Sequence, residues 1–372
     1  MRISGGQVFD LQRGFVSRDV CFDGELISEG CTGGEVYDAT GCYVIPGLTD
    51  LHFHGCMGAD FSDADADGLE TMAKYELSRG VTQICPAGMT LLEEQLIKVC
   101  TVAADHRDAN KPGAELVGIN LEGPFLSMAK KGAQNGDWLH KPDVAMYRRL
   151  AEAGRGLVKL VSLAPEEPGA MEFIDELHDE VVISVAHTTA DYDTALEAYK
   201  RGAREATHLF NAMPPFSHRA PGVVGAAFDS PECRVELICD GVHIHPAVVR
   251  AVFKLFGAER VVLISDTMRA AGMPDGDYTL GGQDVKVTGK LATLADGTIA
   301  GSATDLMECL RTAVSFGIPL SDAVRAAAVN PAEVLGISGR YGTLEPGKAA
   351  NVVVLDGELR VKDVFFRGAV VK

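Results

Sequence analysis

The apolar residues of this chain follow two different patterns. Over residues 1–46, short apolar runs alternate with turn residues, which predicts short strands and hairpins. From residue 47 onward, near-continuous apolar runs alternate with segments in which apolar residues recur every three or four positions. This second pattern predicts strand, loop and helix in repeated order.

Eight apolar runs are strand candidates, and a helical pattern follows most of them. The strand candidates are residues 48–53, 81–85, 116–121, 158–163, 181–186, 205–208, 235–239 and 261–265. The helix candidates between them are residues 68–79, 92–104, 143–153, 170–180, 191–201 and 246–256. Eight such units predict an α/β fold, a parallel (β/α)₈ TIM-like barrel whose reactive groups lie where strands end and loops begin.

The two ends of the chain share a β-rich pattern that the middle lacks. After residue 266, strand patterns occur at 278–280, 285–287, 290–293, 298–300, 351–355 and 363–371, and helical patterns at 305–315 and 321–328. We therefore expect a small β-sandwich domain built from residues 1–46 and 342–372, and a barrel domain over residues 47–341. The hairpins within residues 277–300 are candidates to join the small domain.

The formal charge of −18, from 52 acidic and 34 basic residues, narrows the kinds of partner. Long-range repulsion opposes binding to nucleic acid and to anionic membranes, so neither is expected. A small phosphorylated substrate still fits, because a few Arg, His and backbone N–H groups can bind an anion locally.

Nine cysteines are scattered along the chain without a CxxC pair. Such a set is typical of reduced intracellular thiols and not of a disulfide framework or a structural zinc site. The first residues lack the basic and apolar blocks of a signal peptide, and no apolar run reaches about 18 residues. These observations predict a soluble cytoplasmic protein.

Ligand-type residues stand at the ends of five predicted strands. In chain order they are His52 and His54, Glu122, His187, His208, and Asp266. A single His or Glu at a strand end is more often a hydrogen-bonded structural group, but five strand ends of one barrel favour a metal site. Two imidazoles and a carboxylate leave an open position on a divalent ion, where water can be activated. Asp266, from another strand, is placed to act as the acid/base.

Several longer motifs resemble the amidohydrolase superfamily and, within it, the N-acetylglucosamine-6-phosphate deacetylases. They are PGLTDLHFHG (46–55), LEGPFLSMAKKGA (121–133), VAHTTA (185–190), ATHLFNAMPPF (206–216), DGVH (240–243), LISDTM (263–268) and IAGSA (299–303). EGPF followed by KKGA, and HLFNAM, are specific to these deacetylases, whereas HxH and SDT occur across the superfamily. The resemblance covers essentially the whole chain.

The resemblance implies a role for each matching residue. Glu122, His187 and His208 would hold the main metal ion, and family members that keep both His52 and His54 bind a second ion there. Asp266 would be the acid/base, and His243 would lie near the acetamido carbonyl. The residues implied to bind the phosphorylated amino sugar are Ala133, Gln134, Asn211, Ala212, Arg219, Asp240, His243, Ile299, Ala300 and Gly301. The family arginine at the Arg219 position comes from the neighbouring subunit, which implies a homodimer.

Two positions depart from the patterns of related enzymes. After KKGA the family has a histidine, and this chain has Gln134, which can donate a hydrogen bond but carries no titrating proton. Lys159 stands at the start of its strand and not at the loop end, so a carbamylated-lysine bridge is not expected. Glu122 is then the natural bridging carboxylate.

The activity that the resemblance implies is hydrolysis of N-acetylglucosamine 6-phosphate to glucosamine 6-phosphate and acetate. The ligand set suits Zn, Fe, Mn or Co alike, as one ion or two. An amidohydrolase acting on another N-acyl sugar or a cyclic amide would share the metal residues without needing Arg219. A catalytically silent sugar-phosphate-binding barrel is the alternative from another class, and it would have no chemical reason to keep Asp266.

Overall fold

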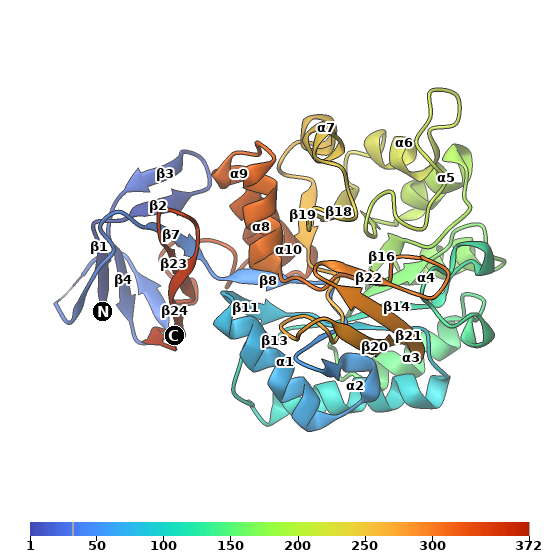
Figure 1. Cartoon of the computed structure of the whole chain (residues 1–372), viewed down its shortest axis with the longest axis horizontal. Helices are drawn as coiled ribbons and strands as arrows, with labels where there is room; N and C mark the ends of the chain where they lie inside the picture. Colours follow the sequence, from blue (N-terminus) through green and yellow to red (C-terminus); the bar gives the residue numbers. More distant parts are fainter. Residues whose placement is uncertain (32, 372) are drawn as a thin grey trace.

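The computed structural model describes residues 1–31 and 33–371. A small body of β-strands holds both ends of the chain, and a larger α/β body lies beside it (Figure 1). Helices α8 (Leu306–Ser315), α9 (Leu320–Val324) and α10 (Asn330–Val334) lie on the side of the larger body that faces the small one (Figure 1).

The larger body is a barrel of eight parallel strands, and all eight predicted strands are present. They are β8 (Leu48–Asp50), β11 (Val81–Ile84), β14 (Ile119–Phe125), β15 (Val158–Leu163), β16 (Val182–Val185), β17 (Glu205–Ala206), β18 (Arg234–Ile238) and β19 (Val261–Ile264). Neighbours along the chain pair in parallel from β14 to β19, and β11 pairs in parallel with β8. These strands are almost entirely buried, because helices cover one face of the sheet and the other face lines the barrel interior.

Backbone hydrogen bonds close the barrel. The Cys85 N–H donates to the Asp50 carbonyl, and the short strand β12 (Ala87–Gly88), just after β11, pairs in parallel with β14. On the other side, the Asp266 N–H donates to the His52 carbonyl at 3.0 Å. The loop ends of the first and the eighth strand are therefore neighbours, although more than half of the chain separates them.

The helices cover the outside of the barrel. They are α1 (Ala66–Ser78), α2 (Glu93–Asp108), α3 (Val144–Ala153), α4 (Ala170–Leu177), α5 (Tyr192–Arg201), α6 (Gly222–Phe228), α7 (Pro246–Phe256), α8 (Leu306–Ser315), α9 (Leu320–Val324) and α10 (Asn330–Val334), with the π-helix η4 (Arg325–Val329) joining α9 to α10. The 3₁₀ helices η1 (Phe61–Asp63), η2 (Met128–Lys130) and η3 (Gly136–Trp138) lie in the connecting segments. Asp65, Asp143, Asp191 and Asp305 cap α1, α3, α5 and α8 by accepting from backbone N–H groups of the first turn.

Both chain ends build the small body. One sheet has the order β5-β4-β1-β6, and the other has the order β25-β24-β23-β7-β2-β3. Their strands are β1 (Arg2–Ser4), β2 (Gln7–Asp10), β3 (Gly14–Ser17), β4 (Val20–Asp23), β5 (Leu26–Ser28), β6 (Val36–Asp38), β7 (Tyr43–Pro46), β23 (Val352–Leu355), β24 (Val361–Phe366) and β25 (Ala369–Val370). Ile3 and Phe22 of the first sheet share one apolar core with Val44 and Phe365 of the second. The α/β barrel with a small β-sandwich is therefore confirmed, and the domain boundaries at 46/47 and 341/342 stay a prediction.

The hairpins within residues 277–300 do not join the small sandwich. They form their own sheet of β20 (Gly276–Leu280), β21 (Gln283–Thr288) and β22 (Leu291–Thr293). Leu280, Val285 and Val287 pack with Met89 and Met268 on the barrel, and this apolar contact explains the location. The sheet lies against the barrel, away from the sandwich (Figure 1).

Three local predictions need correction. Residues 298–300 form no strand and contribute only an isolated bridge between Thr293 and Ile299. The predicted strand 363–371 is divided into β24 and β25 by a turn in which Arg367 and Gly368 both have positive φ angles. The helical stretch predicted for 321–328 continues through η4 and α10 to Val334. The remaining short strands are β9 (Gly55–Cys56), β10 (Ala59–Asp60) and β13 (Glu115–Leu116).

The expectation of free thiols throughout is wrong for one pair. Cys21 and Cys31 form a disulfide, because the β4–β5 hairpin brings their Cα atoms to 5.2 Å, within the range that a disulfide spans. The other seven cysteines are free and buried. Within the described residues, no helix has both the length and the apolar content needed to cross a membrane.

Candidate functional site

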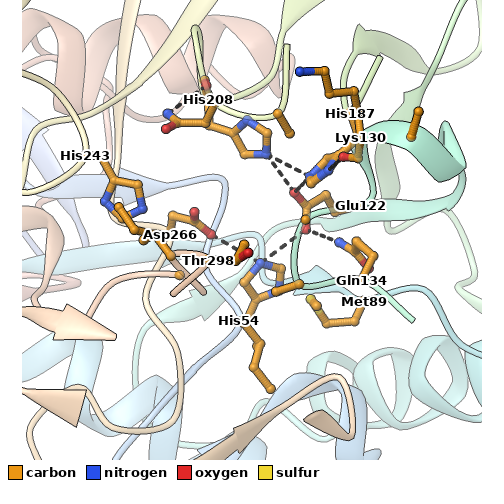
Figure 2. Close-up of a pocket in the computed structure, with 18 residues that line it drawn as sticks. His54, Met89, Glu122, Lys130, Gln134, His187, His208, His243, Asp266 and Thr298 are labelled. Atoms are coloured by element: carbon orange, nitrogen blue, oxygen red, sulfur yellow. Dashed lines mark hydrogen bonds and ion pairs between the residues drawn. The ribbon is translucent and has the colours of Figure 1, made fainter. Parts of the chain in front are cut away.

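A cavity of about 360 Å³ opens where the barrel strands end (Figure 2). Its wall combines residues of the strand ends, of the segment after β14, of the loop after β17, and of the β20–β22 region. The lining residues are His54, Met89, Glu122, Ala129, Lys130, Gly132, Ala133, Gln134, His187, His208, Asn211, Ala212, His243, Asp266, Leu280, Thr298, Ile299 and Gly301. The barrel therefore gathers here side chains that are far apart in the sequence.

Glu122, His187 and His208 form the first group of ligand-type side chains. The Nε2 atoms of His187 and His208 lie 3.0 and 2.9 Å from Glu122 Oε1, and 3.1 Å from each other. All three side chains are more than nine-tenths buried. Three potential ligand atoms thus converge on one point at the cavity floor.

His52, His54 and Asp266 form the second group, next to the first. His54 Nε2 lies 3.2 Å from Asp266 Oδ1 and 3.3 Å from Glu122 Oε2. His52 Nε2 lies 3.8 Å from Asp266 Oδ1 and 3.6 Å from Glu122 Oε1. Within each group, the potential ligand atoms lie within 4.8 Å of one another. Glu122 belongs to the first group and also lies close to His52 and His54 of the second.

The ring orientations show that the two groups fit a cation. The Nδ1 atoms of His187 and His54 donate to the backbone carbonyls of Lys130 and Ala87, at 2.8 and 3.1 Å. In a neutral ring the opposite Nε2 then carries a lone pair, and here it points at carboxylate oxygens. Lone pairs facing carboxylates repel unless a positive charge lies between them. This arrangement is the one that protein ligands adopt around a divalent ion.

The charges of the site are strongly coupled. Burial raises the pKa of Glu122, but the neighbouring imidazoles of His52, His187 and His208 outweigh burial and hold it well below its usual range. Burial lowers the pKa of His54, but Asp266 and Glu122 raise it to about 10. Burial also raises the pKa of Asp266, and the hydrogen bond with His54 brings it below the ordinary value. The carboxylates are therefore charged, and at neutral pH a second proton on His54 supplies the positive charge between them that a bound metal ion would replace.

The backbone is strained at three of these strand ends. His187, His208 and Asp266 have φ angles of 42°, 29° and 50°, in the left-handed region that such residues rarely adopt. Strain of this kind costs of order 1–3 kcal/mol per residue and concentrates at functional sites. The surrounding contacts therefore impose side-chain directions that a relaxed strand end would not give.

Gln134 takes a different position from the one expected. Its Nε2 donates to Glu122 Oε2 at 2.7 Å, and its Oε1 accepts from the Thr90 N–H at 2.7 Å. Gly123, with φ of 122°, lies so close to Thr90 that a Cβ would overlap the threonine side chain. Gln134 lines the cavity, but its side-chain hydrogen bonds orient Glu122 and do not leave the amide free for a substrate.

His243 lies beside Asp266 in the cavity (Figure 2). Its Nδ1 contacts Asp240 Oδ2 at 2.8 Å, and the backbone N–H groups of Val242 and His243 donate to Asp240 Oδ1. Burial lowers the pKa of His243, but Asp240 raises it above the ordinary value. Asp240 itself is 1% exposed and does not line the cavity, so it orients His243 from behind and favours the protonated ring.

The remaining predicted substrate residues divide into two sets. Ala133, Asn211, Ala212, Ile299 and Gly301 line the cavity, whereas Ala300 is fully buried behind it. Arg219 is exposed in the loop after β17 and does not line the cavity of its own chain.

Lys130 is a lining residue that the sequence interpretation missed. Among the described residues that line the cavity, it is the only Lys or Arg. Its Nζ donates to the Met213 carbonyl at 3.2 Å, next to Asn211 and Ala212. Figure 2 shows its amine pointing away from Glu122. The available signal was its place in the KKGA-containing motif, which gives no direction for the side chain.

The chain matches the Amidohydrolase family over residues 43–371. An N-acetylglucosamine-6-phosphate deacetylase of Bacillus subtilis (strain 168) is 38% identical over 330 residues, which are 87% of this chain and 83% of the relative. An N-acetylgalactosamine-6-phosphate deacetylase of Escherichia coli O157:H7 is 34% identical over 87% of this chain and 86% of its own length. A mutant N-acetyl-D-glucosamine-6-phosphate deacetylase from Mycobacterium smegmatis, solved in complex with N-acetyl-D-glucosamine 6-phosphate, has a TM-score of 0.92 and 34% identity, covering 100% of this chain and 98% of that chain.

Proposed function

Because the chain belongs to the amidohydrolase family, we propose that it hydrolyses the acetamide of N-acetyl-D-glucosamine 6-phosphate. The products are D-glucosamine 6-phosphate and acetate, so the reaction belongs to amino-sugar breakdown. The likeness to deacetylases that bear this name extends over most of the chain and supports the proposal.

One observation carries this proposal most directly. Two buried groups of imidazoles and carboxylates meet at the floor of one cavity, with Nε2 lone pairs facing carboxylate oxygens. Glu122, His187 and His208 would hold the main ion, and His52 and His54 a second one. A divalent ion bound there polarises the amide carbonyl and makes water nucleophilic at neutral pH. Imidazole and carboxylate ligands suit Zn, Fe, Mn or Co.

Asp266 and His243 supply the proton chemistry in this proposal. Asp266 takes a proton from the water that attacks the amide carbon, and it delivers that proton to the departing nitrogen as the C–N bond breaks. His243, held by Asp240 and with a raised pKa, donates a hydrogen bond to the carbonyl oxygen as negative charge develops there. Both side chains are oriented before substrate arrives, so little reorganisation is needed.

The substrate phosphate needs positive charge that the cavity floor does not offer. Lys130 supplies it from within the chain, beside the backbone of Asn211 and Ala212. Arg219 is exposed and lies outside the cavity lining, which fits a homodimer in which each copy extends Arg219 into the other's cavity. Ala133 and the segment from Ile299 to Gly301 border the sugar, while Gln134 and Asp240 act by orienting Glu122 and His243.

The proposed location is the cytoplasm. A sugar phosphate carries charge that is costly to bring into a bilayer, so the substrate stays in the compartment where it forms.

Acetate release by the purified protein tests the function. The substrates are N-acetylglucosamine 6-phosphate, its 4-epimer N-acetylgalactosamine 6-phosphate, and unphosphorylated N-acetylglucosamine, each before and after chelator treatment. We expect the first to be hydrolysed best, with activity lost on chelation and restored by a divalent ion. Faster hydrolysis of the 4-epimer would assign the chain the activity named for the Escherichia coli relative. Equal activity on the unphosphorylated sugar would overturn the role of phosphate, and sugar-phosphate binding without acetate release would favour a silent barrel.

A further inference from the structure

Glu236 is a buried carboxylate beneath the cavity floor, on β18 inside the barrel. Its side chain is fully buried, and it is absent from the cavity lining. It therefore has no direct access to a substrate in the cavity. A charge in such a place is costly unless hydrogen bonds or an opposite charge compensate it.

A single oxygen of Glu236 contacts a member of each ligand-type group. Glu236 Oε2 lies 2.8 Å from His52 Nδ1 and accepts from the His208 backbone N–H at 3.0 Å. His52 belongs to the group with His54 and Asp266, whereas His208 belongs to the group with Glu122 and His187. The two imidazole rings are 5.7 Å apart, centre to centre.

The two contacts have separate effects. The first makes His52 donate from Nδ1, so that its Nε2 carries a lone pair toward Asp266 and Glu122. The second supports the backbone of His208 where it adopts its left-handed conformation, with φ of 29°. One carboxylate thus fixes the tautomer of one imidazole and the backbone position of another.

We propose that Glu236 is a positioning residue that couples the two ligand-type groups, so that both are held ready for divalent ions by one carboxylate. The inference depends on the metal-dependent function proposed above. Partners that orient metal-binding histidines through their other ring nitrogen contribute about 10–100-fold to metal affinity. Because Glu236 contacts both groups, its loss weakens every ion that the protein binds and not the ion of one group alone.

Glu205 provides a matched control on the neighbouring strand β17. It is also fully buried, and within the described residues neither of its oxygens has a hydrogen-bond partner. Burial raises the pKa of Glu205 well above the usual range, which favours its neutral form. Glu205→Gln therefore changes a carboxyl group that has no hydrogen-bond partner among the described residues, whereas Glu236→Gln changes the one that contacts His52 and the His208 backbone.

The test measures metal binding without substrate. Metal-free wild type, Glu236→Gln and Glu205→Gln are titrated with Zn²⁺ against a chromophoric chelator, and Co²⁺ absorption spectra report the coordination of each bound ion. We expect Glu236→Gln to bind every ion 10–100-fold more weakly, with a changed Co²⁺ spectrum, and Glu205→Gln to match wild type within about twofold. Both metal-free variants should melt near the wild-type temperature.

Two results would overturn the proposal: unchanged affinity and spectrum in Glu236→Gln, or equal losses in both variants. If Glu236→Gln fails to fold, Glu236→Asp keeps the charge but shortens the side chain, and the same loss of affinity is expected. Metal binding is measured without acetate release, so the result stands whether or not the protein hydrolyses the proposed substrate.

Discussion

At the scale of single residues, the site depends on partners that stand behind the ligand-type side chains. Carbonyls of Lys130 and Ala87 set the ring orientations of His187 and His54, and Gln134 orients Glu122. These contacts explain why ligand-type residues alone do not define a functional site. The residues that contact water, amide and phosphate are then few, and each can be tested separately.

Asp266→Asn should abolish acetate release while the protein stays folded and still binds metal through the group of Glu122. The amide keeps the shape of the side chain but cannot accept the proton, and general-base catalysis contributes about 10²–10⁴-fold. The rate of acetate release, metal content and circular dichroism provide the three readouts. Asp179→Asn, at an exposed turn outside the cavity lining, is the control for the same chemical change. Near-full activity of Asp266→Asn would refute the assigned role.

Lys130→Gln should raise KM for the phosphorylated sugar by about tenfold or more and leave kcat nearly unchanged, since a charged hydrogen bond contributes about 1.5–3 kcal/mol. KM and kcat for the unphosphorylated sugar should not change, because that substrate has no phosphate for Lys130 to bind. Lys141→Gln changes the charge equally at an exposed position outside the cavity lining and should match wild type. A fall in kcat alone would show that Lys130 does not bind the phosphate.

At the scale of elements, an irregularity within β14 determines where Glu122 points: the pairing with β15 shifts register between Leu121 and Phe125. Gly123 has φ of 122° and lies against Thr90, whose N–H donates to Gln134. This part of β14, Thr90 and the segment that carries Gln134 are therefore packed together. A change at Gly123 should affect both stability and the metal site.

Gly123→Ala should lower the free energy of unfolding by about 1–3 kcal/mol, because the added Cβ requires a strained φ angle and overlaps Thr90. Metal content should fall as Glu122 shifts. Urea unfolding and metal analysis measure the two effects. Gly357→Ala, where a Cβ meets open space, should stay within about 0.5 kcal/mol of wild type. Equal stability of the two variants would show that the φ angle of Gly123 and its contact with Thr90 do not constrain this position.

Elements whose burial pattern is simple could be predicted from the sequence. The strand β19 is buried throughout and is an unbroken apolar run. Helix α6 was missed because six of its seven residues are buried, so no polar face marks a helical period. The hairpins β20–β22 could be recognised as strands, but their contact with Met89 and Met268 depends on tertiary packing.

The candidate site was partly predictable for a related reason. The ligand-type residues could be predicted from their place at the ends of strands, because the barrel topology brings those ends together. Lys130 lies in a loop, where no period predicts the direction of a side chain. Glu236 has a signal in the sequence, because it is the one acidic residue in the otherwise apolar run 235–239. The orienting contact of Gln134 depends on the path of the chain near Thr90.

At the scale of the whole molecule, the net charge of the chain and the charge of the proposed substrate have the same sign. The chain carries a formal charge of −18, yet the proposed substrate is an anion. The positive groups that bind it must therefore be few and close, which fits Lys130 in the cavity and Arg219 on an exposed loop. A second copy of the chain would complete the site.

Mixing two inactive variants tests whether Arg219 acts between subunits. If it does, Arg219→Ala and Asp266→Asn each inactivate a homodimer, but a mixed dimer has one site with both residues intact. Unfolding and refolding the variants together should restore on the order of a quarter of wild-type activity by random pairing. Acetate release measures the recovery, and the separately refolded variants are the control. No recovery from a mixture shown to be dimeric would mean that Arg219 serves its own chain.

The pairing of β7 with β23 has a consequence for how the protein is made. Val44 and Val354 are partners in this sheet, although one is synthesised near the start and the other near the end. At about 5–20 residues per second, ribosomes need on the order of tens of seconds to make the roughly 300 residues between them. During that time β7 has no β23 to pair with, and its edge is open to other chains. Nascent copies on one messenger are therefore most exposed to mispairing through their N-terminal strands, and emergence of the C-terminal strands ends that exposure.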